Sequence, residues 1–340
     1  MSAERALLVI TDPAARSADG ESVRVALDVL RAAAPAKIVV PTDSADLERA
    51  LARRGRRRVV VVAGDGGLHT VVRLLDRAGE LAGTPLGVVP VDTRALPAAA
   101  DDAHAMAHAL GLPSEPAKAA RVALGEHERP HDLLCDDLGG VALRSVRIGN
   151  GVRAARPAAA AGLVGRRGWR SIWDRAAHTV TAAVGPAGHR LRVEADGRVI
   201  ADVDQPVLSV HVGCDDRDIC PAVSVNGSGS PSVIMQERSA NIAEPAVGTA
   251  TVLVTAYPSA GRFGLPAQTR GTAARPAPGD DGDPDAGPPP AAHLEVRARE
   301  ITVCGPDFTY EADNQATGPV RLRTWTLRPG AWRLYVPASS

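Results

Sequence analysis

Residues 59–72 read Val-Val-Val-Val-Ala-Gly-Asp-Gly-Gly-Leu-His-Thr-Val-Val, a glycine-rich turn between an apolar run and an amphipathic segment. Four consecutive valines are typical of a strand that is buried on both faces of a sheet. Leu68, Val71 and Val72 have the spacing of one helical face. The stretch therefore predicts a strand over 58–63, a tight turn, and a helix over 67–77.

The same alternation of strand and helix runs through the first 112 residues. Strands are predicted over 6–10, 37–40, 58–63 and 86–90, and helices over 21–34, 45–53, 67–77 and 98–110. Repeated strand–helix units favour a parallel sheet with helices on both faces. We expect an α/β nucleotide-binding domain over residues 1–114.

The pattern changes near residue 115 to short β-like runs separated by turn signals such as Asp196-Gly197. This half, residues 115–340, predicts a β-rich sandwich or barrel-like domain with one helix over 169–183. Pro, Gly, Ala and Asp dominate 271–292, which is predicted to be a disordered insertion. Residues 321–337 are expected to pack back near the first domain. The β-like runs are 121–124, 141–148, 190–195, 207–212, 250–255, 293–303 and 321–336.

Composition excludes several classes of protein. Basic and acidic residues balance at 39 each, so no global field favours nucleic acid. The four cysteines show no CxxC pair, which argues against a zinc site or a disulfide framework. The apolar run at 6–10 is too short for a signal sequence or a membrane span. We expect a cytoplasmic protein without a transmembrane segment.

The glycine-rich turn has the chemistry of a phosphate site. Backbone N–H groups at a helix N-terminus favour an anion, and Gly64, Gly66 and Gly67 carry no Cβ that would hold a phosphate away. Asp65 could hold Mg²⁺ or take a proton from an attacking hydroxyl. The turn lacks the Gly-Lys-Ser/Thr of a P-loop, so taken alone it leaves a nucleotide site and an ordinary strand–helix turn about equally open.

These residues carry a resemblance to a family. Residues 59–72 resemble the Gly-Gly-Asp-Gly-Thr region of the diacylglycerol kinase/sphingosine kinase catalytic-domain family. Further family landmarks occur in order along nearly the whole chain, at Asp12, Thr42, Leu86–Pro90, Asp313 and Leu327–Pro337.

The resemblance implies an α/β domain plus a β-rich domain, with ATP and Mg²⁺ in the cleft between them and a lipid hydroxyl as acceptor. It implies Asp65 or Asp313 as the catalytic base, and a lipid substrate taken at the membrane surface, with peripheral membrane association. The nucleotide-binding positions that it implies are Asp12, Thr42, Gly64, Gly66, Gly67, His69 and Thr93.

Several family residues are replaced. Ala63 stands for the first glycine of the motif, Gly67 for its threonine and Thr70 for a glutamate of the following helix. Residues 91–96 keep only Thr93 of a Leu-Gly-Thr-Gly-Asn-Asp segment, and Gln315 stands for a glutamate. Loss of one preorganised polar group can cost about 10²–10³ in rate. An active lipid kinase and a pseudokinase that binds nucleotide or lipid both remain open, whereas a NAD kinase-like enzyme is disfavoured because its downstream Asn-Glu pair has no counterpart.

Other residue clusters allow both a functional and a purely structural interpretation. Asp215, Asp216 and Asp218 could hold a divalent cation or form a solvated turn, and we favour the turn. Trp169 and Trp173, beside three arginines, suit either an interfacial segment or packing between domains. His104 and His108 are four residues apart, but a solvated helix face is favoured over a metal site. Exposed edge strands in the second half permit pairing into a homodimer.

Overall fold

The structure is a computed structural model, and it describes residues 6–91, 105–149, 188–214, 248–256, 292–313 and 315–338. The helices are α1 (Pro13–Ala18), α2 (Gly20–Ala33), α3 (Ser44–Ala52), α4 (Asp65–Arg77), α6 (Ala105–Ala109) and α7 (Pro116–Leu124). The strands of the first half are β1 (Leu7–Thr11), β2 (Ala36–Val39), β3 (Arg58–Ala63) and β4 (Leu86–Pro90). Those of the second half are β5 (Glu128–Asp136), β6 (Val141–Ala142), β7 (Ser145–Gly149), β8 (Arg192–Ala195), β9 (Arg198–Ala201), β10 (Val207–Gly213), β11 (Ala250–Ala256), β12 (Ala292–Ala298), β13 (Glu300–Ala312) and β14 (Gln315–Tyr335).

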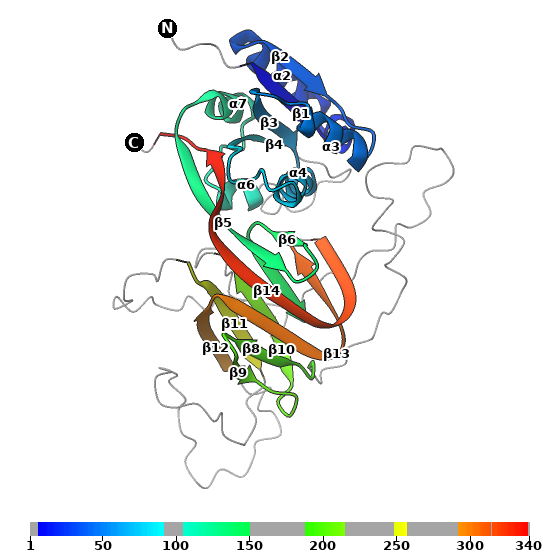
Figure 1. The fold of residues 1–340 in the computed structure, drawn as a ribbon, viewed down its shortest axis with the longest axis vertical. Helices are drawn as coiled ribbons and strands as arrows, with labels where there is room; N and C mark the ends of the chain where they lie inside the picture. Colours follow the sequence, from blue (N-terminus) through cyan, green and yellow to red (C-terminus); the bar gives the residue numbers. More distant parts are fainter. Residues whose placement is uncertain are drawn as a thin grey trace, which may run out of the picture.

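The first half is a parallel sheet in the order β2-β1-β3-β4. Alternate residues of β3 enter two different apolar cores, because successive side chains of a strand point to opposite faces. Val60 and Val62 pack with residues of α1, α2 and α7, whereas Val59 and Val61 pack with residues of α3, α4 and α6. Helices therefore cover both faces of the sheet (Figure 1). The predicted fold class, a parallel α/β unit followed by a β-rich region, is confirmed.

The long strand β14 connects this sheet to the second half. Its end lies beside β4 in parallel, with Leu334 paired to Leu86, while its earlier residues pair with β13 and β5 in antiparallel fashion. Trp332 and Leu334 are fully buried and belong to the same core as β3 and α4. Trp332 Nε1 also donates a hydrogen bond to the Asp132 carbonyl on β5 at 3.1 Å. The core of the α/β half thus includes side chains from the last described strand.

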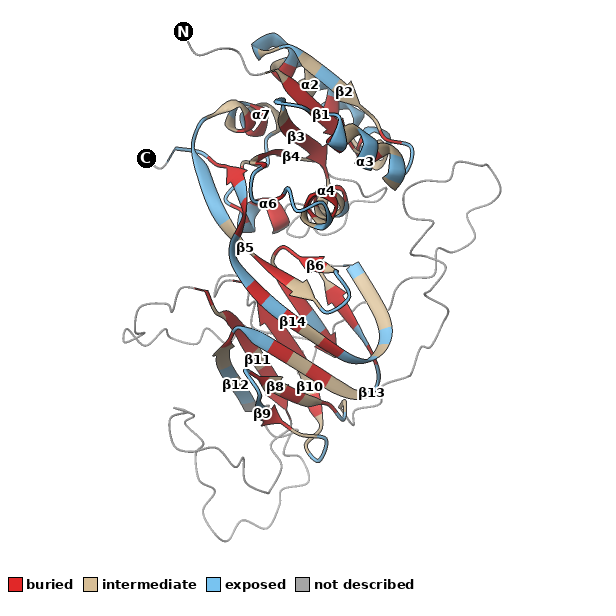
Figure 2. Ribbon diagram, in the orientation of Figure 1, coloured by how far each residue is buried: buried red, intermediate tan, exposed pale blue. Residues whose placement is uncertain are grey.

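The second half encloses its own core. Strands β12, β11, β10, β7 and β13 pair in that order, all antiparallel, and β8 pairs with β13 and β9. Tyr310 and Trp325 meet edge to face in this core, with ring centroids 5.2 Å apart. Alternating buried and exposed residues along β13 and β14 are visible as colour bands in Figure 2.

One predicted strand is wrong. Residues 121–124 belong to helix α7, which starts at Pro116 after Glu115 in extended conformation. Proline is favoured at the first helical position, and the buried Ala119, Ala120 and Ala123 fit a helix packed tightly on the sheet. The apolar residues of Arg121–Leu124 fit a short strand equally well, and only the alanines before them indicate a helix.

Other predicted elements differ in extent. The run 141–148 divides into β6 and β7, and 293–303 divides between β12 and β13 at Arg299. Strand β5 was not predicted, because Pro130 and the charged residues around it hide its alternation. The predicted helix over 169–183 lies outside the described residues, as does the predicted insertion over 271–292 except for Ala292, which begins β12. None of the described helices has both the length and the apolar character of a membrane span.

Gly87 allows α7 to lie against β4, and this contact can be tested. A Cβ at Gly87 would lie 2.7 Å from the Cβ of Ala123 and 3.2 Å from its Cα. Gly87→Ala should therefore lower the free energy of unfolding by about 1–3 kcal/mol in urea denaturation. Gly20→Ala is the control, since a Cβ at Gly20 has nothing within 4 Å. Equal stability of the two variants would contradict the tight packing of α7 on β4.

His211 should make stability depend on pH. Burial, with Arg147 and Arg144 nearby, lowers the pKa of His211 to about 4. Between pH 6.5 and 4 the unfolded chain binds a proton that the folded chain does not, so the free energy of unfolding falls as pH falls. His211→Gln should remove a component of about 2 kcal/mol from this dependence between pH 7 and pH 5 in urea denaturation. Equal pH dependence of stability in His211→Gln and in the wild type would contradict a buried, uncharged imidazole at this position.

Candidate functional site

The site lies at the edge of the parallel sheet where its strands end. Strand β1 has β2 on one side and β3 on the other, so the connections leave in opposite directions from this point. In open α/β sheets, ligands bind in the crevice outside the carboxyl ends of the strands at such a switch point. Asp12 follows β1 and Gly64 follows β3, so the topology places both residues at this crevice.

The glycine-rich turn opens helix α4. Gly64 is the N-cap in extended conformation without a side-chain cap, and Asp65 is the first helical residue. The first amides of a helix have no intrahelical acceptor and carry the positive end of the helix dipole. Gly66 is exposed beside them, while Asp65 is half-buried. The turn thus presents amides and one carboxylate at the crevice, which is the arrangement expected for Mg²⁺-neutralised phosphate.

Gly67 explains two of the family replacements together. A Cβ at Gly67 would lie 2.6 Å from the Cβ of Ala63 and 3.1 Å from Oδ2 of Asp12. Positions 63 and 67 therefore share space for only one methyl group. In this chain the methyl group belongs to Ala63 at the end of β3, and position 67 is glycine. The two departures from the Gly-Gly-Asp-Gly-Thr motif are a single steric exchange across the turn.

Asp12 is held by its own loop and faces the turn. Its Oδ1 accepts a hydrogen bond from the Ala14 amide at 2.8 Å, which caps α1, and its own amide donates to the Val62 carbonyl at 3.0 Å. The second carboxylate oxygen, Oδ2, points toward Gly67. Asp12 and Asp65 thus approach the start of α4 from two neighbouring strands.

The turn between β13 and β14 brings the second half to the same place. Asp313 has φ 49° and is 6% exposed. Its Oδ2 accepts from the Leu143 amide at 2.6 Å, and its Oδ1 accepts from the amides of Arg144 and Ser145 at 2.9 and 3.2 Å. These three hydrogen bonds anchor the loop between β6 and β7 to the β13–β14 turn. The Nε2 atom of Gln315, two residues later, lies 3.5 Å from the Cβ position of Gly66.

His69 and Thr42 differ in position, since His69 lies between α4 and β6 and Thr42 lies beyond the edge strand β2. His69 Nε2 is 2.6 Å from the Val141 carbonyl, so the imidazole connects α4 to β6. Thr42 is exposed after β2, the edge strand, and its amide donates to Oδ2 of Asp46 at 3.2 Å. The structure therefore brings Asp12, Asp65, Gly66, Gly67 and Gln315 together, while β1 separates Thr42 from the glycine turn.

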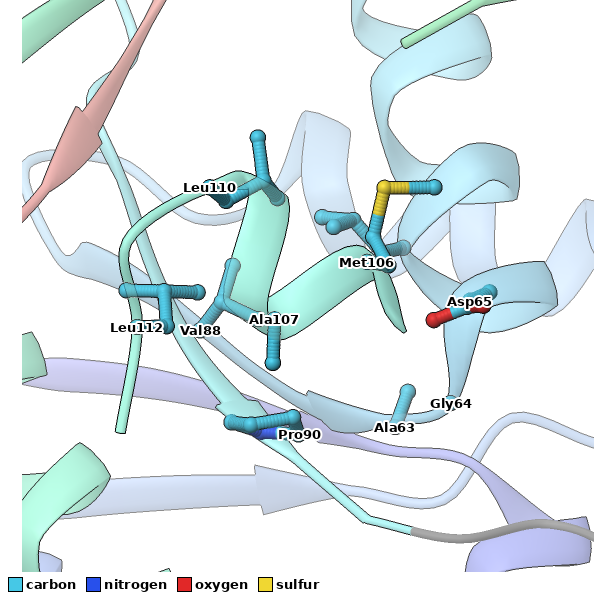
Figure 3. A pocket seen from close by; sticks show the side chains of 10 residues that line it. Ala63, Gly64, Asp65, Val88, Pro90, Met106, Ala107, Leu110 and Leu112 are labelled. Carbon is cyan, nitrogen blue, oxygen red and sulfur yellow. The ribbon is translucent and has the colours of Figure 1, made fainter. Parts of the chain in front are cut away.

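A shallow apolar depression adjoins Asp65. Asp65 lies at one end of it, and Leu110 and Leu112 lie at the other (Figure 3). Its free volume is about 10 Å³, which is about the space of one water molecule, so the depression has no room for a ring in this conformation. This apolar lining was not identified from the sequence, although Met106, Ala107 and Leu110 belong to the helix predicted over 98–110. The lining is Ala63, Gly64, Asp65, Leu68, Val88, Pro90, Met106, Ala107, Leu110 and Leu112.

Some predicted site residues lie outside the described part of the chain. These are Thr93, His104, and the three aspartates Asp215, Asp216 and Asp218. Among the residues that the structure describes, no group of three or more His, Cys, Asp or Glu side chains has a metal-binding arrangement. A magnesium ion with one or two carboxylate ligands and phosphate oxygens needs no such group.

Comparison with known proteins agrees with this geometry. Residues 6–135 match the family model described as the diacylglycerol kinase catalytic domain. The predicted resemblance to this family is thereby confirmed, and the match supports a lipid kinase-like function. No curated protein matches the sequence.

Solved structures share the fold over the whole chain. A diacylglycerol kinase from Bacillus anthracis str. Sterne superposes with a TM-score of 0.53 at 16% identity, over 98% of this chain and 97% of its own. Two further solved chains from that organism give TM-scores of 0.54 and 0.55, at 17% and 16% identity and with the same coverage. Identity this low shows a common fold.

The shared space between positions 63 and 67 predicts a coupled pair. Gly67→Ala should lower the free energy of unfolding by about 1–3 kcal/mol, because its methyl group meets that of Ala63. Adding Ala63→Gly should recover at least about 1 kcal/mol of that loss, measured as a coupling energy in urea denaturation. Gly66→Ala is the control, because a Cβ there lies 3.5 Å from the nearest atom. Additive effects of the two substitutions would contradict the steric exchange.

Proposed function

We propose that the chain is an ATP-dependent lipid kinase that phosphorylates a hydroxyl of a diacylglycerol-type lipid. The observation that carries the proposal is Asp65 at the first position of α4, on a glycine turn at the switch point of the sheet, with Asp12 facing the same turn. The match to the diacylglycerol kinase catalytic domain supports the choice of a lipid acceptor. The β-rich half would supply the lipid pocket, and the reaction would take place at a membrane surface.

Asp65 is our candidate for the proton acceptor. In the proposed reaction the lipid oxygen forms a bond to the γ-phosphorus of ATP, the bond from that phosphorus to the bridging oxygen breaks, and ADP leaves with its electron pair. The hydroxyl proton passes to the Asp65 carboxylate. The N-terminus of α4 holds the transferring phosphoryl group and offsets its charge through the helix dipole, as positioning and electrostatics dominate phosphoryl transfer.

The acidic groups fit a magnesium ion. Mg²⁺ keeps several waters and binds through one or two carboxylates together with substrate phosphates. Asp12 would serve as such a ligand, because its Oδ2 faces the start of α4, and Asp65 lies in the same turn. When bound, the ion would neutralise charge on the phosphates.

We assign Asp313 a positioning role within this proposal. Its carboxylate oxygens already accept hydrogen bonds from three backbone amides, which hold the β13–β14 turn against the loop between β6 and β7. Through this turn Gln315 is brought to Gly66. The anchor therefore controls how closely the two halves meet at the site.

A pseudokinase that binds nucleotide or lipid is the second candidate. The observation that favours it is the exchange at positions 63 and 67, which leaves position 67 without the hydroxyl of the family motif. Thr70 also serves the helix itself, since its Oγ1 donates to the Gly66 carbonyl at 2.8 Å. In this reading the crevice binds a nucleotide without transferring its phosphate.

Asp65→Asn tests the catalytic assignment. The substitution keeps the shape and removes the proton acceptor, so transfer of ³²P from ATP to a dispersed diacylglycerol should fall by about 10²–10⁴-fold. The Tm of Asp65→Asn should stay near that of the wild type. Asp313→Asn should lower the Tm, because one backbone amide that donates to the carboxylate then loses its acceptor. The exposed Asp204→Asn serves as a matched control without effect on either measurement.

Three outcomes separate the candidates. If the wild type labels the lipid and Asp65→Asn abolishes this labelling, the result supports the kinase with Asp65 as the base. Labelling that survives Asp65→Asn shows that Asp65 is not the base. If the wild type labels no lipid while ATP with Mg²⁺ raises its Tm, the pseudokinase is correct.

A further inference from the structure

A row of polar residues crosses the second sheet on the side away from its apolar core. Val146 and Ile148 of β7 and Val210 and Val212 of β10 enter that core. Since side chains alternate along a strand, Arg147 and His211 point to the opposite side, which we call the outer face.

The register aligns these residues directly across the strands. Arg147 pairs with His211 on β10 and with Glu311 on β13. His211 pairs in turn with Leu253 on β11, which pairs with Glu295 on β12. Directly opposed side chains have Cβ atoms about 4.5–5.5 Å apart, so the guanidinium and imidazole groups can meet at one ligand.

Within the described ranges, one polar atom in this row is buried without a partner, and the guanidinium beside it forms no ion pair. His211 is 7% exposed, and its Nε2 atom is buried without a hydrogen-bond partner. Its neighbour Arg147 is exposed and, among the residues that the structure describes, forms no ion pair or hydrogen bond. A buried polar atom without a partner costs stability, and native proteins usually satisfy such groups. The pair thus places a buried imidazole nitrogen, without a partner in the described part of the chain, beside an exposed guanidinium.

The local charge selects the kind of ligand. Burial is the main cause of the lowered pKa of His211, and the charges of Arg147 and Arg144 lower it further, so two cations lie near the imidazole. Of the acidic residues in the row, Glu311 lies directly opposite Arg147, on the side away from His211, and Glu295 is separated from His211 by one strand. A phosphate group accepts several hydrogen bonds and pairs well with a guanidinium.

The outer face is connected to the glycine turn. The amide of Arg144 donates to Asp313, whose turn carries Gln315 to Gly66. Arg147 lies three residues further along the chain, which is about 10 Å of extended strand. A phosphate held there would sit near the crevice but apart from the reacting centre.

We propose that Arg147 and His211 form a binding site for a phosphate-bearing ligand on the outer face of the second sheet. The shared chemistry is a phosphate monoester or free phosphate, which accepts a hydrogen bond from His211 Nε2 and pairs with the Arg147 guanidinium. Binding there is separate from phosphoryl transfer, so it does not depend on whether Asp65 is a catalytic base.

The imidazole itself reports on the site. A bound anion favours protonated His211 and should raise its pKa from about 4 by about one unit or more. We would titrate the full-length wild type by NMR, following the carbon-bound imidazole protons of its nine histidines. His211→Gln assigns the signal by its loss. The titration is run alone, with inorganic phosphate, with dihexanoyl phosphatidic acid, and with uncharged dihexanoylglycerol.

Arg147→Gln supplies the second measurement. Because Arg147 is exposed, the variant should fold, and we expect it to weaken phosphate-ligand affinity at least about tenfold. Arg198→Gln, at an exposed position of β9, is the control and should bind as the wild type does.

The arms of the titration decide the source of the phosphate. A raised pKa with both phosphate and phosphatidic acid supports a site for small anions, and a shift with phosphatidic acid alone supports a lipid headgroup site. A pKa that stays at its starting value with both, or affinity that Arg147→Gln leaves unchanged, overturns the proposal. A shift with dihexanoylglycerol equal to that with phosphatidic acid would also overturn it, because the phosphate would then be irrelevant.

Discussion

The pairing of β14 with strands of both halves holds this molecule together. Its end is parallel to β4, and its middle is antiparallel to β5 and β13. Backbone hydrogen bonds therefore join the parallel sheet to the antiparallel one without a flexible linker. The turn that precedes β14 reaches the glycine turn of α4 because the strand fixes where that turn lies. The position of Gln315 beside Gly66 thus depends on β14, which pairs mainly with β13 and β5.

The parallel half could be predicted well because its elements have strong periodicity. The strand over 58–63 and the strand over 86–90 have the predicted bounds, since uninterrupted apolar runs mark doubly buried strands. The helix predicted over 45–53 is α3, which begins after its N-cap Asp43, whose side chain accepts a hydrogen bond from the Asp46 amide at 2.7 Å. Helix α7 was misread because alanine packs in helices through small size, which an apolar pattern does not reveal.

The candidate site was only partly readable. Local motifs identified Asp65 and its glycines, since their chemistry resides in consecutive residues. The steric relation of Ala63 to Gly67 and the three amides on Asp313 depend on distances across the turn and across the chain. The pairing of Arg147 with His211 depends on strand register, which spacing in the sequence does not fix. Sequence reasoning could identify the chemical groups at the crevice, and tertiary structure was needed to show which of them meet.

The participation of Trp332 and Leu334 in the first core has a consequence for the order of folding. The contact of Leu334 with Leu86 closes a loop of about 250 residues, and such distant contacts form slowly. During synthesis, the edge of β4 and the apolar surface around it must wait for the last described strand. Before that strand arrives, an unpaired edge is open to other chains, as expected of large proteins that fold through intermediates. Nascent chains of this protein should therefore depend on chaperones until β14 has left the ribosome.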